Sequence, residues 1–493
     1  MAATVTVVLD MTIANVALSS IAGNIGATHE QSSWILTSYV VAETVAMPMT
    51  AWFVGKFNAK KMFIYCILGF TASSLLCGAS TTITQIVFFR FIQGLFGAGI
   101  IPLSQSILID MNEAKDQGKA MAIWGMGIMI GPILGPSLGG YITEYYSWRY
   151  IFFINLPIGI LSTIGLLKYL PEIASKGRKF DFLGCFLFSV FICSLQLFLD
   201  RGEEKDWLES GEIKTYLFLC ITFFAGFIHH VVFSKKKNTI INMDIFKDKN
   251  YAVSTIFSFC VGMILFSSMS ILPPFMETIL GYDTIQCGLL LAPRGCGVFI
   301  AMFMYAKFGN KIDQRIIIIA GFLLIGGSMY QMTDYSEYTS TIDILIPSII
   351  QGVGLGFCFP PLSAIGFSTL DPKLRSEATS IFSLIRNIGS SVGISIIIFF
   401  SSRSSKENYG ILSENINPSS KNFIHYTDIA EKMGQGEAIQ GLMIQNELLR
   451  QSMIIGYLNT FKLIMVLALC VIPLVLIIKK SNNFSNNNET MAH

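Results

Sequence analysis

Long runs of apolar residues alternate with short polar segments along the whole of this chain. An apolar helix of about 20 residues is long enough to cross the hydrocarbon core of a membrane. Backbone groups in lipid must be paired within the segment, which favours helices over strands. We therefore predict an all-α polytopic membrane protein with fourteen spans, near residues 1–22, 34–54, 62–79, 84–109, 119–143, 149–170, 181–199, 214–233, 250–274, 285–306, 315–332, 343–369, 377–402 and 453–478.

Two of these spans carry the same residue order. The fourth reads FIQG at 91–94 and PLS at 102–104, and the twelfth reads IIQG at 349–352 and PLS at 361–363. Internal repeats are typical of secondary transporters, whose site lies between the repeats near the midplane. The alternative is a chance similarity of two Gly-rich helices, which the matching polar loops 110–119 and 371–377 make weaker. The predicted domains are an N-terminal six-helix bundle (1–170), two inserted helices with a cytoplasmic linker (171–249), a C-terminal six-helix bundle (250–478) and a disordered cytoplasmic tail (479–493).

Composition and charge support a membrane protein and suggest its orientation. Of 493 residues, 52% are hydrophobic and 13% are charged, against roughly 25% charged in soluble proteins. With the N-terminus in the cytoplasm, the predicted cytoplasmic segments hold 21 Lys and Arg, whereas the opposite loops hold four outside the long loop 403–454. The positive-inside rule then predicts a multi-pass protein of the inner membrane with both termini in the cytoplasm. The basic residues within the spans are Arg90, Arg294, Arg386 and Lys462.

Charges inside the spans are candidates for function, because an unpaired charge there costs about 2.5–3.5 kcal/mol on insertion scales. Asp10 lies in the first span, Glu43 in the second, Arg90 in the fourth and Arg386 in the thirteenth. A carboxylate facing an arginine forms a pair that a proton breaks, which is the two-state element that proton coupling needs. The alternatives are a static ion pair for Asp10 and Arg90, a solvated vestibule for Glu43, and snorkelling or carbonyl capping for Arg386.

The fifth span has the most specific pattern of small residues. It reads WGMGIMIGPILGPSLGG over 124–140 and places small residues at helical spacing, with two prolines four positions apart. Small residues let another helix approach closely, and the prolines kink one face. An ordinary Gly-rich packing helix is the alternative. The predicted hinge residues are Gly127, Gly131, Pro132, Gly135, Pro136, Gly139 and Gly140.

Three of these patterns resemble motifs of the fourteen-helix drug:proton antiporter family of the major facilitator superfamily. Residues 9–18, which include Thr12 and Asn15, resemble its first-helix motif. Arg90, Gln93, Gly94 and Gly97 resemble its fourth-helix motif, for which the family implies a basic residue in proton transfer. The fifth-span run resembles the antiporter motif of exporters, and LDRG at 199–202 with Asp206-Trp207 resembles the family's loop after the seventh helix.

The resemblance covers nearly the whole chain and implies the major facilitator fold, with two six-helix repeats and two inserted central helices. It implies a proton-coupled antiporter that exports hydrophobic or amphipathic drugs or toxic compounds by alternating access. Asp10, Arg90 and Glu43 are then the candidates for proton coupling, and Arg386 is a candidate for the substrate cavity. The resemblance also implies a periplasmic membrane-fusion adaptor and an outer-membrane channel as partners. We expect no cofactor, no metal and no nucleic acid.

Other features set limits on this interpretation. The loop after the second span should contain an acidic residue, but residues 51–61 read AWFVGKFNAKK, so the charge-relay lock of the superfamily is in doubt. No G-x-x-x-x-G-K-[ST] motif is present, which argues against an ATP-driven pump. A membrane enzyme would need a polar catalytic cluster at one membrane face, and a channel would not need the repeat. The alternative within transporters is export of one endogenous metabolite or siderophore.

Residues 403–452 form a polar segment outside the cytoplasm in this orientation, far longer than a typical connection. Helix formers alternate with apolar positions such as Ile439, Leu442 and Leu449 in its second part. We therefore predict a short helical cap over 425–452 at the exit that contributes to adaptor docking. The alternative is a cap that packs on itself and has no partner.

Overall fold

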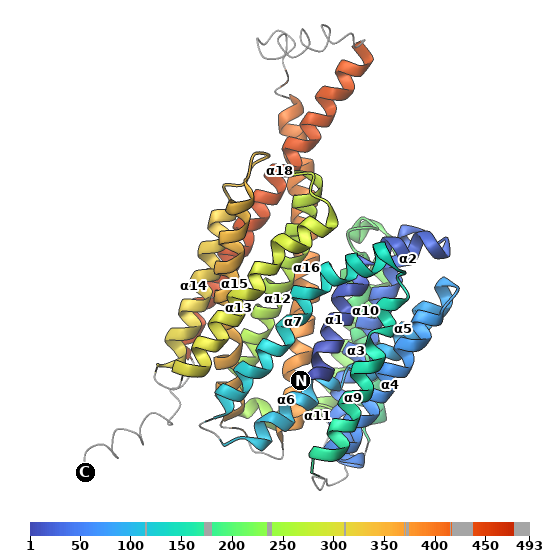
Figure 1. The fold of residues 1–493 in the computed structure, drawn as a ribbon, viewed down its shortest axis with the longest axis vertical. Coiled ribbons are helices and arrows are strands. Elements are labelled where there is room, and N and C mark those ends of the chain that lie inside the picture. Colours follow the sequence, from blue (N-terminus) through green and yellow to red (C-terminus); the bar gives the residue numbers. More distant parts are fainter. Residues whose placement is uncertain are drawn as a thin grey trace, which may run out of the picture.

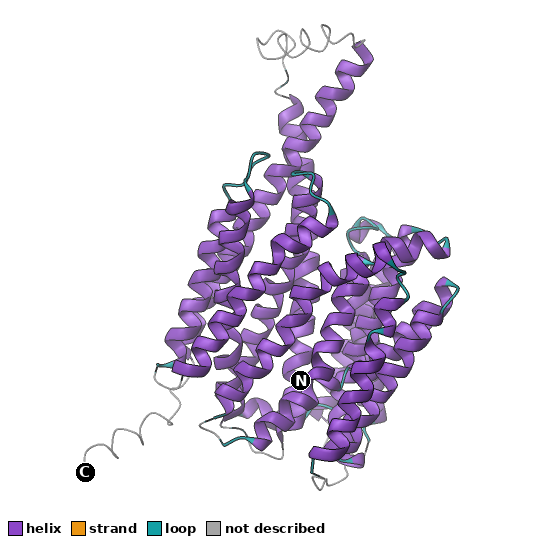
Figure 2. Cartoon of the chain, viewed as in Figure 1, coloured by secondary structure: helices purple, strands orange, loops and turns teal. Residues whose placement is uncertain are grey.

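The computed structural model describes residues 1–113, 116–171, 180–233, 239–309, 312–368, 370, 374–414, 416 and 437–477. Every regular element within these residues is a helix (Figure 2). The long helices lie side by side with similar axis directions, so the molecule is a helical bundle (Figure 1). The predicted all-α class is therefore confirmed.

The N-terminal part of the bundle is formed by α1 (Ala2–Val16), α2 (Leu18–Ile25), α3 (His29–Phe57), α4 (Ala59–Ala79), α5 (Ile83–Gly97), α6 (Ile100–Met111), α7 (Gln117–Tyr145), α8 (Tyr150–Phe153) and α9 (Asn155–Tyr169). Helix α3 begins at a capping box in which Thr28 and Gln31 each satisfy the other's backbone N–H. Asn58, with φ of 67°, ends α3, and its side chain accepts a hydrogen bond from Lys61 N at the start of α4.

The rest of the chain continues with α10 (Phe182–Arg201), η1 (Trp207–Glu209), α11 (Gly211–Phe233), η2 (Met243–Lys247), α12 (Lys249–Thr278), α13 (Thr284–Phe308), α14 (Gln314–Met332), α15 (Thr341–Ser368), α16 (Arg375–Glu414), α18 (Glu437–Val471) and η4 (Ile472–Ile477). Helices α10 and α11 pack on each other, and α10 also contacts α3 and α16. The inserted pair therefore touches helices from both repeats. The division into domains stays a prediction.

The number of membrane spans differs from the expected fourteen. Among the described residues, 11 helices are long and apolar enough to cross a membrane, or 12 if α1 and α2, which meet at 60°, count as one span. Helices α3 and α7 are outside this set. The apolar run of α3 is interrupted by Glu43 and by several hydroxyl residues. Helix α7 contains residues 132, 133, 136 and 137, whose side chains are not among the described residues, so the count does not cover this helix as a whole. The prediction of many spans is confirmed, and the count of fourteen is not.

The segment expected to be a long polar loop is helical at both of its ends. Helix α16 continues to Glu414 and α18 begins at Glu437, so residues 403–414 and 437–452 belong to helices. These two ends project beyond the rest of the bundle, at the top of Figure 1. Of the predicted cap 425–452, residues 437–452 are the first part of α18, and 425–436 lie outside the described residues.

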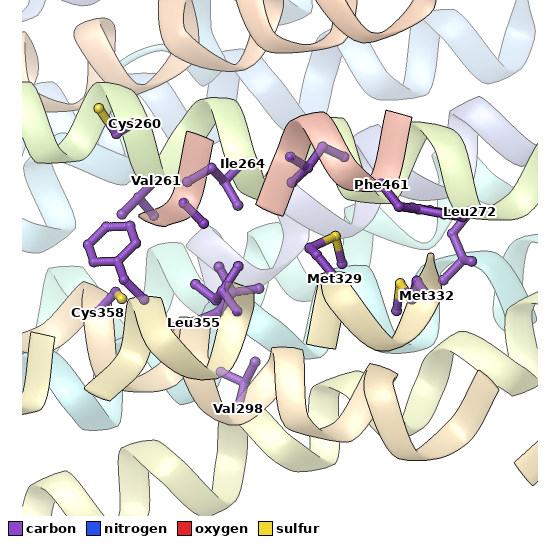
Figure 3. Close-up of a cluster of buried hydrophobic side chains, with 14 of the residues drawn as sticks. Cys260, Val261, Ile264, Leu272, Val298, Met329, Met332, Leu355, Cys358 and Phe461 are labelled. Carbon is purple, nitrogen blue, oxygen red and sulfur yellow. The ribbon is translucent and has the colours of Figure 1, made fainter. Parts of the chain in front are cut away.

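Two clusters of buried apolar side chains stabilise the bundle, both within a repeat and between the repeats. One joins α12, α13, α14, α15 and α18 and includes Leu272, Met329 and Phe461 (Figure 3). A second joins helices of both repeats, with Trp124 of α7 and Phe382 of α16 in the same cluster. The two halves are therefore in direct contact, and the polar groups described next are set within a packed apolar interior.

Candidate functional site

Asp10 and Arg90 form a buried ion pair between α1 and α5. Arg90 Nη1 lies 2.5 Å from Asp10 Oδ2, and the side chains of Arg90 and Asp10 are 0% and 1% exposed. Attraction between opposite charges is strongest where water is excluded, and removing one partner leaves the other charge uncompensated. The two charges are therefore bound to each other as long as both are present.

Gln93 and Asn155 complete the hydrogen bonding of the Asp10 carboxylate. Gln93 Nε2 donates to Asp10 Oδ1 at 3.1 Å, while Gln93 Oε1 accepts from Arg90 Nη1 at 2.8 Å. Asn155 Nδ2 donates to the same Oδ1 at 2.6 Å and to Ser74 Oγ at 2.9 Å. Each of these donors stabilises the ionised carboxylate. A proton placed on Oδ2 would face the Arg90 N–H, so protonation and the ion pair exclude each other.

Asn155 and Ser74 are members of this network that the sequence analysis missed. Asn155 is 0% exposed and lies at the start of α9, within a predicted apolar span. Ser74 is also 0% exposed, lies within α4, and donates to Phe152 O at 2.9 Å. A single amide within an apolar run was the available signal for Asn155. A serine gives a weaker signal, because serine commonly bonds to its own helix.

Aromatic rings cover the guanidinium of Arg90. Its Cζ lies 5.2 Å from the ring centroid of Tyr39 and 5.1 Å from that of Phe152. Arg90 Nε and Nη2 are buried and have no hydrogen-bond partner within the described residues. Cation–π contacts of desolvated groups contribute about 2 kcal/mol. The rings therefore stabilise the cation without providing a second acceptor that could replace Asp10.

The glycines of the fourth-helix motif allow α5 to approach α3. A Cβ added at Gly97 would lie 2.7 Å from Tyr39 Oη, and one at Gly94 would overlap Tyr39 O. These positions have no room for a larger residue. The motif therefore positions Tyr39 beside Arg90. Asn15 of the first-helix motif is exposed and does not join the network.

The fifth-span motif packs α7 against α1 next to Asp10. A Cβ at Gly131 would lie 2.9 Å from Leu9 N, and one at Gly139 would lie 3.1 Å from Ile13 Cγ2. At Gly135 a Cβ would overlap Thr12 Oγ1, which donates to Gly131 O at 3.2 Å. The motif therefore brings the two helices into backbone contact.

Two other glycines of the motif have more room. A Cβ at Gly127 would lie 3.8 Å from Val5 Cγ2 and one at Gly140 would lie 3.5 Å from Ile285 Cγ1, which are ordinary distances. The side chains of Pro132 and Pro136 lie outside the described residues. The close contact is therefore concentrated at Gly131, Gly135 and Gly139.

Glu43 and Arg386 meet where the two repeats touch. Glu43 of α3 is 1% exposed, and its Oε2 has no hydrogen-bond partner within the described residues. Arg386 of α16 is close enough to interact electrostatically with Glu43, and its Cζ lies 5.6 Å from the ring centroid of Phe359 of α15. Glu43 is therefore separate from the Asp10 network and faces a cation of the other repeat.

A second contact joins the repeats near the end of α6 and the start of α16. Arg375 Nη1 of α16 lies 3.0 Å from Asp110 Oδ1 of α6. Gln105 Nε2 of α6 donates to Ser363 Oγ of α15 at 3.4 Å. Residues 51–61, which the structure places in the end of α3, Asn58 and the start of α4, lack the acidic residue of the superfamily's charge-relay lock. The Asp110–Arg375 pair links the repeats without it.

The C-terminal repeat contains a further buried polar group around Arg294. The sequence analysis names this arginine only as a charge within a span. Arg294 Nη2 of α13 donates to Ser268 Oγ of α12 at 2.7 Å and to Gln351 Oε1 of α15. Gln351 is the counterpart of Gln93 in the sequence repeat. Both repeats therefore contain a buried arginine that donates to the repeated glutamine.

Comparisons with known proteins agree with this arrangement. A model of the Major Facilitator Superfamily matches residues 1–394. The fatty acid resistance protein FarB of Neisseria gonorrhoeae is 34% identical over 475 residues, which are 96% of this chain and 93% of FarB. The multidrug export protein EmrB of Escherichia coli K12 is 31% identical over 453 residues, covering 91% of this chain and 88% of EmrB. The human organic anion transporter MFSD10 has a similar fold, with a TM-score of 0.59 and 12% identity over 96% of this chain and 98% of its own.

Proposed function

This chain belongs to the major facilitator superfamily, and from that premise we propose that it exports hydrophobic or amphipathic drugs or toxic compounds across the inner membrane in exchange for protons. Transporters of this kind work by alternating access around a site between their repeats. The observation that supports proton coupling is the buried Asp10–Arg90 ion pair, because a proton on Asp10 removes the attraction that holds Arg90.

The packing around Asp10 suggests how its protonation changes the conformation. With Asp10 ionised, α1 is bound to α5 through Arg90 and to α9 through Asn155. A proton weakens both links, so α1 becomes free to shift. Helix α1 is in backbone contact with α7 at Gly131, and α7 packs along α13 of the other repeat. A movement of α1 is therefore passed through α7 to the interface between the repeats.

The substrate class is supported by the names of the relatives. EmrB is a multidrug export protein and FarB is a fatty acid resistance protein, and both align with more than nine-tenths of this chain. Lipophilic compounds of more than one chemical type are therefore the expected substrates. A resistance panel on cells with and without the gene separates this function from export of one endogenous metabolite, which would protect against few or none of the compounds.

Everted membrane vesicles test proton coupling directly. An inward-acid gradient should drive uptake of a lipophilic dye by the wild type, and a protonophore should stop it. Asp10→Asn keeps the shape of the side chain but cannot exchange a proton, so its gradient-driven uptake should fall to the background. The matched control is Asp343→Asn, which changes a carboxylate that accepts from Ser340 Oγ at the start of α15. Undiminished uptake by the Asp10 variant would refute the proposal.

The projecting ends of α16 and α18 are the proposed docking point for a periplasmic adaptor that passes substrate to an outer-membrane channel. This role follows from the orientation with cytoplasmic termini, which places these ends on the exit side. Deletion of 408–440 with a Gly-Ser bridge should leave transport in everted vesicles intact and abolish resistance in whole cells. Persistence of resistance would mean that docking lies elsewhere.

A further inference from the structure

The glycines of the two repeats show which residues occupy equivalent positions around the repeated glutamine. A Cβ at Gly94 would meet Tyr39 O and Glu43 N, and a Cβ at Gly352 would meet Arg294 O and Val298 N. Both pairs are four residues apart on the helix that faces the glycine. The α5–α3 contact of one repeat therefore corresponds to the α15–α13 contact of the other, and Arg294 occupies the position of Tyr39.

The charge balance at the two equivalent places differs. Arg90 has Asp10 as its counter-ion, whereas Arg294 donates to Ser268 and Gln351, which are both neutral. Within the described part of the chain no carboxylate forms an ion pair or hydrogen bond with Arg294, and its buried Nε has no partner. A buried cation without a counter-ion is costly, by several kcal/mol. Ser268 donates its own proton to a backbone carbonyl of its own helix at 2.8 Å, so the donors left for an anion are on Arg294 and on Gln351 Nε2. Among the described residues, this place therefore has donors but no anion.

We propose that Arg294, Ser268 and Gln351 form a binding site for one monovalent anionic group, which is the carboxylate of a lipophilic substrate. This proposal deepens the proposed function and rests on it. Arginine binds carboxylates through charge-assisted hydrogen bonds, and the Arg294 side chain has donors in addition to the one used by Ser268 and Gln351. The substrate's carboxylate takes the place that Asp10 occupies in the N-terminal repeat.

The surroundings of this site suit an apolar molecule with one charged end. Ser268 lies one helical turn before Leu272, and Gln351 Nε2 lies 4.0 Å from Met329 Sδ. Figure 3 shows Met329 and Met332 beside Leu272 and Phe461. Methionine side chains are flexible and adapt to ligands of different shape. Arg294 is 6% exposed, so the residue is not completely sealed from solvent.

Binding of decanoate and of decanol to the purified protein in lipid nanodiscs tests the proposal. The two probes share the alkyl chain and differ in the charged group. We expect Arg294→Gln to weaken decanoate binding about 10- to 100-fold, as expected for a lost charged hydrogen bond, and to leave decanol binding unchanged. Arg294→Lys keeps the charge without the planar fork and should retain part of the affinity. Both variants are compared after their thermal stability has been measured.

The matched control is Lys462→Gln, which removes a cation from an exposed position of α18 in the same repeat. It should bind decanoate like the wild type. In an Asp10→Asn background, Arg294→Gln should still weaken decanoate binding relative to decanol binding, because Arg294 binds the carboxylate, so a failure of proton coupling is distinguished from a failure of this site. Equal decanoate affinity in the wild type and in Arg294→Gln would overturn the proposal. Stabilisation by chloride over gluconate that depends on Arg294, without any effect of decanoate, would overturn the carboxylate assignment in favour of a free anion.

Discussion

In the N-terminal repeat, Arg90 pairs directly with Asp10 and Gln93 bonds to both. In the C-terminal repeat, Arg294 donates to Gln351 and to the neutral Ser268. The first arrangement contains its own counter-ion, so the particle that it can exchange is a proton. The second contains a cation that has no counter-ion among the described residues, and a bound ligand can supply one. The same repeated glutamine can therefore serve proton coupling in one half and substrate binding in the other.

The largest difference between the repeats is expected from removal of each arginine. Arg90→Met leaves Asp10 as an uncompensated buried charge and should destabilise the protein by about 3–5 kcal/mol. Arg294→Met removes a charge that no described carboxylate balances, so it should be neutral or stabilising. Thermal unfolding in detergent, followed by fluorescence-detected size exclusion, measures both.

The double variant with Asp10→Asn and Arg90→Met serves as the control for this comparison. It removes both charges of the pair and should recover much of the stability that Arg90→Met loses. If Arg294→Met costs as much stability as Arg90→Met, the two repeats do not differ in charge balance, and the comparison is wrong.

The next effect concerns the contact between α1 and α7. Gly131→Ala places a Cβ 2.9 Å from Leu9 N, beside Asp10, so α1 has to move. Overpacking of this kind typically costs about 1–3 kcal/mol, and we expect transport to fall while substrate binding is retained. Gly127→Ala is the matched control, because its Cβ would lie 3.8 Å from Val5 Cγ2. Normal transport by Gly131→Ala would show that the close contact is not needed.

A carboxylate introduced into the C-terminal repeat should make it resemble the N-terminal one. Ser268→Asp places an acid beside Arg294, with which it should form an ion pair that competes with a ligand carboxylate. We expect decanoate affinity to fall about tenfold, corresponding to about 1.4 kcal/mol, with little change for decanol. Ser268→Asn is similar in size and uncharged, and should have the smaller effect. Equal affinities of the two variants would contradict a charge-based site.

The smallest effect is expected at the contact between the repeats. Glu43→Gln removes a carboxylate that faces Arg386 but leaves the Asp10 pair unchanged. Efflux should decrease about two- to fivefold, which corresponds to about 0.4–1 kcal/mol, and mainly for cationic substrates, because the Asp10 pair still couples protons. Arg386→Ala should instead shift the substrate range. An equal loss for all substrates after either change would indicate a structural role.

Much of the fold could be predicted from the sequence, because apolar runs of membrane length leave few alternatives to helices. The bend between α1 and α2 and the extension of α16 over 403–414 were not predicted, whereas a helix over 437–452 was. Neither has a strong local signal, since Ala17 at the bend is an ordinary helix former and the extension of α16 is polar. The relatives confirm the family resemblance.

The candidate site was only partly visible in the sequence. Asp10 and Arg90 stand out because charges are rare within apolar spans, and the structure brings them together as an ion pair. Asn155 and Ser268 could not be assigned, because polar uncharged residues are tolerated in membrane helices and their partners lie on other helices. Arg294 was visible as a charge, but only the packed bundle shows that no carboxylate in the described part of the chain pairs with it. The roles of these residues stay predictions.

Proton release on substrate binding tests the central claim most directly. The purified wild-type protein, in weakly buffered detergent solution with a pH indicator, should release protons when a lipophilic cationic substrate is added, because substrate binding favours the state with the ionised Asp10–Arg90 pair. Asp10→Asn should bind the substrate and release none. Equal proton release by the wild type and by Asp10→Asn would contradict the assignment of proton coupling to Asp10.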